Sequence, residues 1–140
     1  MLKEWTLSYI KNRDLVHRRI SNVEDKGDYF LVTHKDESHI ILLVKENIDN
    51  FSVVIERIKQ LEKDHSANKI SLVIYNNKQN LELLLKHWNE LAEIVQLTLI
   101  FANPRIGDKW IISPHVHDKI ADSETLELGV RTMFESVESY

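Results

Sequence analysis

The sequence predicts an α/β fold, namely a single domain over residues 1–140 with a mixed five- to six-stranded sheet flanked by helices. The main indication is that short segments rich in β-branched and aromatic residues alternate with segments whose apolar residues recur at helical spacing. The chain also has only 3 glycines and 2 prolines, which favours regular elements with short connections. We expect the element order α-(β)-β-β-α-β-α-β-β-α.

The first element is a helix over about residues 2–12, where apolar side chains fall on one helical face. Two interpretations are open for the segment that follows it. Val16, Ile20 and Val23 continue the helical stripe, whereas residues 18–23 alternate enough to form a short strand. The sequence does not decide between them.

Two strands follow, over residues 29–33 and 39–45, because both segments are rich in aromatic and β-branched residues. Only the polar turn around residues 35–38 separates them. Strands joined by so short a connection are expected to form an antiparallel hairpin.

The middle of the chain repeats strand–helix units. The expected elements are a helix capped by Asp49 or Asn50, a strand over 69–75, a helix capped by Asn76 or Asn77 whose apolar stripe runs to Leu91, and a strand over 97–101. Strands that alternate with amphipathic helices imply crossover connections and a locally parallel sheet. The strand over 97–101 is the most apolar, and we expect it to be central.

The last third begins with a strand over 109–113 that pairs back across the turn at 105–108. Asp122 or Ser123 is expected to cap the final helix. Gly129 lies inside that helix, where glycine costs up to about 1 kcal/mol against alanine. A close contact between helix and sheet would explain its presence.

Composition excludes several classes of protein. The chain has no cysteine, which rules out disulfides, thiolate nucleophiles and cysteine-based zinc sites. It begins without the apolar region of a signal peptide, and its longest apolar run is far too short to cross a membrane. We therefore expect a soluble, cytoplasmic protein. The net charge of −4 disfavours a dedicated nucleic-acid binder.

Charge is distributed unevenly along the chain. Residues 1–20 carry five Lys or Arg and two acidic side chains, whereas residues 122–140 carry one Arg and five acidic side chains. One interpretation is that two solvated helix faces attract each other within the fold. The other is that opposite ends meet across a homodimer.

A candidate ligand site follows the apolar strand over 97–101. Its residues are Asn103, Arg105, Lys109 and Trp110. At a strand end, Arg105 could clamp an anion and Trp110 could provide a stacking wall. The alternative is a turn fixed by Pro104, with an exposed arginine and a core tryptophan.

A candidate metal site is the run His115-Val116-His117-Asp118. On an extended segment His115 and His117 point the same way, and two imidazoles on one face can bind a divalent metal. The candidate ligands are His115, His117, Asp118 and Asp122, with His34 or His39 as alternative third ligands. In the other interpretation Pro114 begins a short helix, and the two imidazoles diverge. No other cofactor is predicted.

Other catalytic patterns are absent. The polar segment 76–80 lies between a strand and a helix, but it lacks the glycines of a phosphate-binding loop, so we interpret it as a helix cap. No Gly-x-Ser-x-Gly nucleophile motif occurs.

If residues 18–23 form a strand, the order α-β-β-β-α-β over residues 1–75 is similar to the core of restriction-endonuclease-like nucleases. The resemblance implies an acid on one hairpin strand, here Asp28 or Asp36, and an acid-x-lysine triplet on the next. The matching triplet is Leu43-Val44-Lys45, which has the lysine but not the acid, and Glu46 lies on the wrong face. The resemblance is topological and carries no intact motif.

Three function classes follow from these features. The first is a non-enzymatic interaction or accessory protein that binds an unknown protein partner or forms a homodimer. The second is a small metal-dependent hydrolase or nuclease-like enzyme, and the third is a binder of a small anionic ligand at the strand-end loops. The sequence identifies no specific reaction.

Overall fold

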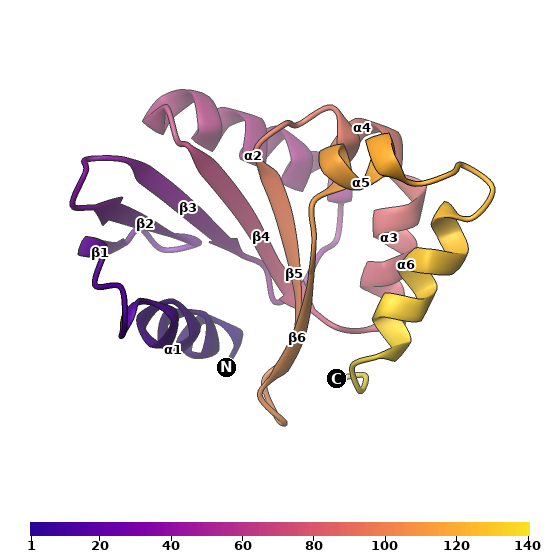
Figure 1. Cartoon of the computed structure of the whole chain (residues 1–140), viewed down its shortest axis with the longest axis horizontal. Coiled ribbons are helices and arrows are strands. Elements are labelled where there is room, and N and C mark those ends of the chain that lie inside the picture. The colour runs from indigo at the N-terminus through magenta and orange to yellow at the C-terminus, as the bar shows by residue number, and fades with distance from the viewer.

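A six-stranded sheet forms the middle layer of the molecule in the computed structural model, which describes all 140 residues (Figure 1). The strands are β1 (Ile20–Asp25), β2 (Tyr29–His34), β3 (His39–Val44), β4 (Lys69–Tyr75), β5 (Leu97–Asn103) and β6 (Asp108–Ile112). The helices are α1 (Leu2–Asp14), α2 (Phe51–His65), α3 (Lys78–Lys86), α4 (Trp88–Ala92), α5 (Pro114–Ile120) and α6 (Leu126–Glu135). The predicted α/β pattern is confirmed.

The strands lie side by side in the order in which they occur along the chain. β1, β2 and β3 form an antiparallel meander, β3, β4 and β5 run parallel, and β6 returns antiparallel to β5. The parallel pairs are those connected through helices, as crossover geometry requires. β1 decides the question that the sequence left open: residues after α1 form a strand, with a bulge between Ile20 and Asn22.

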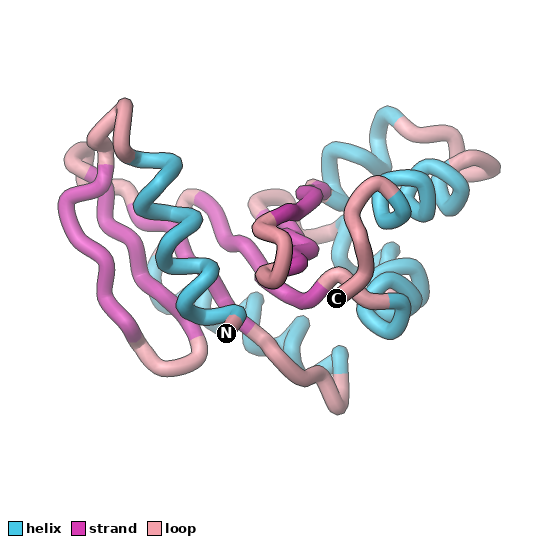
Figure 2. The backbone as a smooth tube through the Cα atoms, turned by 90° about the horizontal axis from the view of Figure 1, so that it is seen from below, coloured by secondary structure: helices cyan, strands magenta, loops and turns pink.

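Helices cover both faces of this sheet and create two cores (Figures 1 and 2). The larger core joins the sheet to α2, α3, α4 and α6, because the apolar stripe of α2 and alternate residues of every strand from β2 to β6 point to that face. The smaller core lies on the opposite face, where α1 inserts Leu2 and Ile10 against Phe30, Leu42 and neighbouring residues. No helix is long and apolar enough to cross a membrane.

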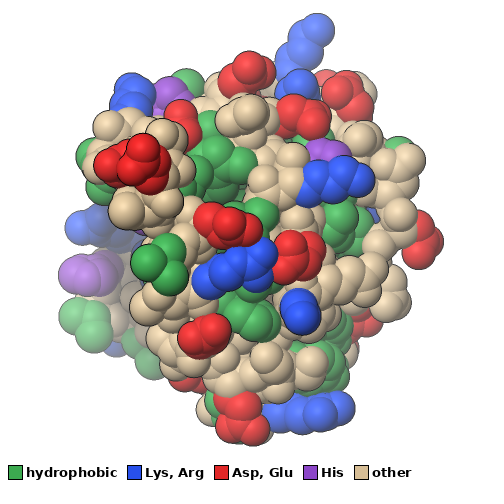
Figure 3. Space-filling view, turned by 90° about the vertical axis from the view of Figure 1, so that its right-hand side faces the viewer, with side chains coloured by type: hydrophobic (Ala, Val, Ile, Leu, Met, Phe, Trp, Pro, Cys, Tyr) green, Lys and Arg blue, Asp and Glu red, His purple; other side chains and the backbone are tan.

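The charged helices near the two ends of the chain, α1 and α6, pack against opposite faces of the sheet, so their charges do not pair with each other. The ends meet through Tyr140, whose hydroxyl lies 3.2 Å from Met1 Sδ. On α6, Arg131 instead pairs with Glu82 of α3 at 2.9 Å and with Glu127 at 3.0 Å. Figure 3 looks onto the α3 and α6 end, where acidic and basic side chains are interspersed.

β5 is fully buried, as its apolar sequence predicts, but it is the fifth of six strands rather than the middle one. The difference arises because the β1–β2 hairpin adds two strands beyond β3, whereas only β6 lies beyond β5. The middle of the sheet therefore falls between β3 and β4.

Two helices differ from expectation. The helix that follows β4 is capped by Asn77, whose side chain accepts from the Asn80 backbone N–H, but it breaks at His87 into α3 and α4. The break directs Trp88 toward α5, where its Nε1 donates to Asp118 over 2.9 Å. The last helix begins after Thr125 rather than after Asp122 or Ser123. Asp122 instead accepts from the Glu124 backbone N–H in the preceding turn.

The expected reason for Gly129 is wrong. A Cβ atom added at this position would meet nothing within 4 Å, so no close approach to the sheet requires a glycine there. Gly107 is different, because the turn between β5 and β6 holds it at a φ of +69°, in the region that favours glycine.

Candidate functional site

The carboxyl ends of β4 and β5 are the place where an open α/β sheet usually binds ligands. Here Asn76 follows β4 and is completely buried. Its side-chain oxygen accepts from Trp110 Nε1 over 2.8 Å, and its nitrogen donates to the Val137 carbonyl over 3.0 Å. The strand end is thus bonded to β6 and to the chain segment after α6.

Asn103, at the end of β5, makes a similar pair of bonds. Its side-chain nitrogen donates to the Glu138 carbonyl over 2.8 Å, and its oxygen accepts from the Arg105 backbone N–H over 3.1 Å. Asn103 therefore fixes both the turn that follows it and the segment 137–140.

Tyr140 completes this arrangement. Its backbone N–H donates to the Asn76 carbonyl, and its ring stacks on Tyr75 with centroids 4.1 Å apart. The guanidinium of Arg105 also lies over the Tyr140 ring, 4.4 Å from its centroid. The segment 137–140 therefore occupies the strand ends that the sequence suggests for a ligand.

The four predicted ligand residues do not converge. Asn103 and Arg105 lie in one turn, whereas Trp110 is buried in the larger core, stacked on Phe101 at 4.3 Å. The Lys109 ammonium lies over the ring of Tyr9 in α1, on the other face of the sheet. The geometry corresponds to the alternative of a turn with a core tryptophan, and the binding role of these residues stays a prediction.

The metal candidates lie on a helix rather than on an extended segment. Pro114 is at the first position of α5, where its fixed φ suits a helix start. His115 Nδ1 donates to the Ala92 carbonyl over 2.8 Å, and the His117 ring packs edge-on against Trp88. The extended interpretation is therefore wrong, because the two imidazoles have different partners. No group of three or more His, Asp or Glu side chains that could hold a metal occurs in the structure.

Only some of the residues that the resemblance to nucleases identifies lie close together. Asp28 precedes β2, and its carboxylate lies 3.7 Å from the Lys45 ammonium after β3. Arg57 of α2, however, donates from Nε and Nη2 to both carboxylate oxygens of Asp28, each over 3.2 Å. Leu43 is fully buried in the larger core. Asp36 lies in the β2–β3 turn and accepts from Ser38.

The charges around Asp28 determine its ionisation. Partial burial alone would raise the pKa of this carboxyl, but the hydrogen bond and charge of Arg57, together with the charge of Lys45, outweigh burial and lower it. The carboxylate therefore stays ionised as part of an ion-pair cluster.

Glu46 is engaged elsewhere, at the start of the chain. One carboxylate oxygen accepts from the Leu2 backbone N–H over 2.9 Å, from the Met1 amino group over 3.2 Å and from the Tyr75 hydroxyl over 3.1 Å. These donors, the Leu2 N–H foremost, lower the pKa of Glu46, while burial and the neighbouring carboxylate raise that of Tyr75. Glu46 anchors α1 to the sheet.

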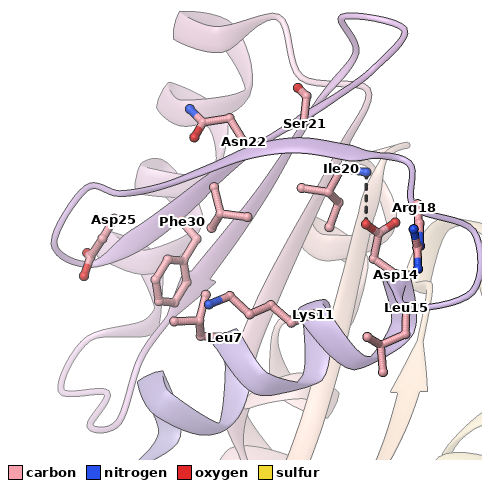
Figure 4. A pocket seen from close by; sticks show the side chains of 11 residues that line it. Leu7, Lys11, Asp14, Leu15, Arg18, Ile20, Ser21, Asn22, Asp25 and Phe30 are labelled. Carbon is pink, nitrogen blue, oxygen red and sulfur yellow. Dashed lines mark hydrogen bonds between the residues drawn. The ribbon is translucent and has the colours of Figure 1, made fainter.

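A groove of about 570 Å³ lies between α1 and β1, and sequence reasoning did not find it (Figure 4). Its apolar lining comes from Leu7 and Leu15 of the α1 segment, Ile20 and Val23 of β1, and Phe30 of β2. The signals in the sequence were the alternation of residues 18–23 and the surplus of basic residues before Ile20, but neither indicates a cavity by itself.

The groove is lined by the cations Lys11 and Arg18 and by the acids Asp14 and Asp25. Arg18 also lines a neighbouring hollow together with Arg19 and Lys35, and we call these three residues the basic corner. The acids of the groove are engaged: Asp14 accepts from the backbone N–H groups of Arg19 and Ile20, and Asp25 pairs with Lys3. Lys11 and the three cations of the basic corner form no salt bridge. The neighbouring hollow measures about 510 Å³ and also includes His17 and His34.

Comparison with known proteins does not extend these observations: no protein family, no curated protein sequence and no solved structure matches the chain.

Proposed function

We propose that this chain is a non-enzymatic interaction protein that binds another polypeptide, and that its recognition surface lies along α1 and β1. The observation that carries this proposal is a contrast between the carboxyl ends of β4 and β5 and the edge of the sheet at β1. The carboxyl ends of β4 and β5 are filled by Asn76, Trp110 and the segment 137–140. The free edge strand β1, in contrast, borders an open, partly apolar groove.

The polar residues that the sequence offers for chemistry support the same proposal, because each has a packing partner. Asp118 accepts from Trp88, His115 donates to the Ala92 carbonyl, and Arg105 covers Tyr140. Such contacts hold elements of the fold together. Arg18, Arg19 and Lys35, which form no salt bridge, lie together instead at the basic corner.

The proposal is tested by selecting binders from a displayed library of random peptides of roughly 12 residues, long enough to span β1. The full chain serves as bait, and hydrogen exchange of the complex locates each enriched peptide. We expect peptides that protect the amides of Ile20–Asp25. A library that yields no binder would contradict the proposal.

A thermal-shift screen tests the two alternatives, an anionic-ligand site and a metal site. Nucleotides, inorganic phosphate, Mg²⁺, Mn²⁺ and Zn²⁺ are expected to leave the Tm unchanged. A rise of several degrees that disappears in Arg105→Ala would favour an anionic-ligand site, and one that disappears in His117→Ala would favour a metal site.

The second candidate function is a nuclease-like hydrolase. The contact between Asp28 and Lys45 favours it, since both stand at neighbouring ends of β2 and β3 within the α-β-β-β-α-β order. This function predicts Mg²⁺-dependent cleavage of plasmid or single-stranded DNA. The cleavage should be abolished in Lys45→Ala. Arg57, which occupies both oxygens of Asp28, argues against metal binding there.

A further inference from the structure

We propose that the occupant of the groove is an extended, acidic segment of a partner protein, which pairs as an added strand with the free edge of β1 and directs its acidic side chains to the basic corner. This inference rests on the proposed function as a polypeptide-binding protein and specifies the chemistry of the partner.

The backbone of β1 provides the pairing groups. β1 is the outermost strand, so only one of its edges is bonded. In an antiparallel pair, residues alternate between those that bond the neighbouring strand and those whose backbone groups point away from it. The N–H of Lys26 donates to the Tyr29 carbonyl, so Lys26 is one of the residues that bond β2. By that alternation Val23 and Asp25 present their N–H and carbonyl groups outward. An extended peptide can satisfy these groups as a further strand of the sheet.

The side chains beside this edge provide an apolar floor. Val23 lies opposite Val32 and Asp25 opposite Phe30, so both β1 residues point to the face that carries α1. α1 packs beneath β3 and β4, which leaves the underside of β1 open. Figure 4 shows Leu7 and Phe30 on one side of the groove and β1 above it. Every second side chain of a docked strand would enter this space.

Charge selects an acidic strand. Lys11 extends from α1 along the groove toward Leu7, and Arg18 stands at the opposite end of the groove (Figure 4). The groove acids are engaged, Asp14 by backbone N–H groups and Asp25 by Lys3, whereas the cations Lys11 and Arg18 have no ion-pair partner. Arg18 is held in place by its backbone, which adopts a φ of +49° and donates to the Asp14 carbonyl over 2.7 Å. An acidic side chain at this end of the groove would lie close to the Arg18 side chain.

Two other occupants fit this surface less well. The β1 edge of a second copy would bring Arg18 and Arg19 of its own, while its acids Glu24 and Asp25 are paired with Lys26 and Lys3. A single-stranded nucleic acid needs aromatic faces for its bases, and the one aromatic ring that lines the groove, Phe30, is buried.

The decisive experiment uses two fluorescein-labelled synthetic peptides with the same alternating Val-Thr strand. One carries Glu-Asp-Glu at its end and the other Lys-Arg-Lys, and each is made with the charged block at either terminus. Fluorescence anisotropy with the full chain should show an acidic peptide binding about tenfold more tightly than its basic twin, as complementary charge requires. Equal binding of the twins would overturn the proposal.

Variants then locate the charge effect. Lys11→Glu combined with Arg18→Glu should reverse the preference between the twins. The matched control is Lys63→Glu combined with Lys86→Glu, which changes the net charge equally on exposed positions of α2 and α3. If the control reverses the preference as well, the attraction is a property of net charge and the groove is not the site.

Backbone pairing has its own readout. N-methylation of alternate peptide amides should abolish binding for the set that faces β1 and spare the other set. Identical effects of the two sets would exclude an added strand. Light scattering that finds a dimer whose dissociation accompanies peptide binding, or tighter binding of an oligothymidine of about 12 nucleotides, would assign the groove to another occupant.

Failure of this inference can be distinguished from failure of the proposed function. If library peptides bind but protect a surface away from Ile20–Asp25, the chain still binds polypeptides and only the assignment to β1 fails. If no library peptide binds, both fail.

Discussion

The side chains of Asn76 and Trp110 share a hydrogen bond of 2.8 Å inside the core, where the indole Nε1 donates to the amide oxygen. The same amide donates to the Val137 carbonyl, and the backbone N–H of Asn76 donates to Ala102. One residue therefore joins β4, β5, β6 and the segment after α6.

Asn76→Ala should lower the free energy of unfolding by about 2–4 kcal/mol, because the indole N–H and the Val137 carbonyl lose their partner in a buried place. Urea denaturation measures the change, with the exposed Asn22→Ala as the matched control. Equal losses in the two variants would mean that water replaces the amide.

Ser71 and Thr98 form an isolated polar pair between β4 and β5, with their hydroxyl oxygens 2.7 Å apart and both side chains buried. Ser71→Ala and Thr98→Val should each cost about 1 kcal/mol, because each leaves one hydroxyl without its partner. The double variant should be no less stable than the worse single one. A double-mutant cycle tests this, and strict additivity of the two losses would contradict it.

The Asp28 cluster should make stability depend on pH in the acid range. The folded state lowers the pKa of Asp28 below the ordinary value of 3.8, so the stabilisation is present above that value and is lost as pH falls through the lower, folded pKa. Asp28→Asn should cost about 1 kcal/mol at pH 7, the scale of a solvent-screened ion pair.

The difference between wild type and Asp28→Asn should shrink as the pH is lowered below about 5. Chemical denaturation over a series of pH values measures it, and Asp49→Asn, at an exposed position before α2, is the control. A difference that stays constant into acid would show that the charge of Asp28 contributes nothing.

Tyr140 should hold the segment 137–140 on the strand ends by its ring. Tyr140→Ala loses the stacking on Tyr75 and the contact with Arg105, which together are expected to contribute about 1 kcal/mol. Amides of the β5–β6 turn should then exchange faster with solvent, while Tyr140→Phe should behave as the wild type. Unchanged exchange in Tyr140→Ala would assign the anchoring to the bonds of Asn76 and Asn103.

Gly129→Ala should stabilise the protein by up to about 1 kcal/mol, because alanine favours a helix interior. The open space around the position allows the added methyl group. Thermal unfolding should show a higher Tm, whereas Gly107→Ala, at positive φ, should show a lower one. A destabilised Gly129→Ala would reveal a packing constraint on α6.

Much of the fold could be predicted because local patterns and tertiary packing agree over β2 to β5 and α2. In α2, for instance, Phe51, Val54, Ile55, Ile58 and Leu61 form the predicted stripe and are all buried. Residues 18–23 could not be assigned, since their apolar spacing suits both a helix and a strand. In the structure these residues pair with β2 and therefore form a strand. The spacing of apolar residues within one segment cannot predict pairing with another segment.

Less of the candidate site than of the fold could be predicted from the sequence. The apolar strand over 97–101 was predicted, but the segment 137–140 that covers its end lies far along the chain, with Glu138 35 residues beyond Asn103. For the histidines, the helical interpretation depended on Pro114, and that local signal proved decisive. The groove arises from the distance between α1 and β1, which no single segment encodes.

The order of the strands in the sheet has a consequence for how the protein is made. Because every strand pairs with the one synthesised just before it, the sheet can grow in one direction while the chain leaves the ribosome, without waiting for a distant segment. The contacts that later residues make, such as the bonds between the strand ends and residues 137–140, form after the sheet is complete. Assembly from the first hairpin onward, with residues 137–140 docking after the sheet has formed, is the route that this topology favours.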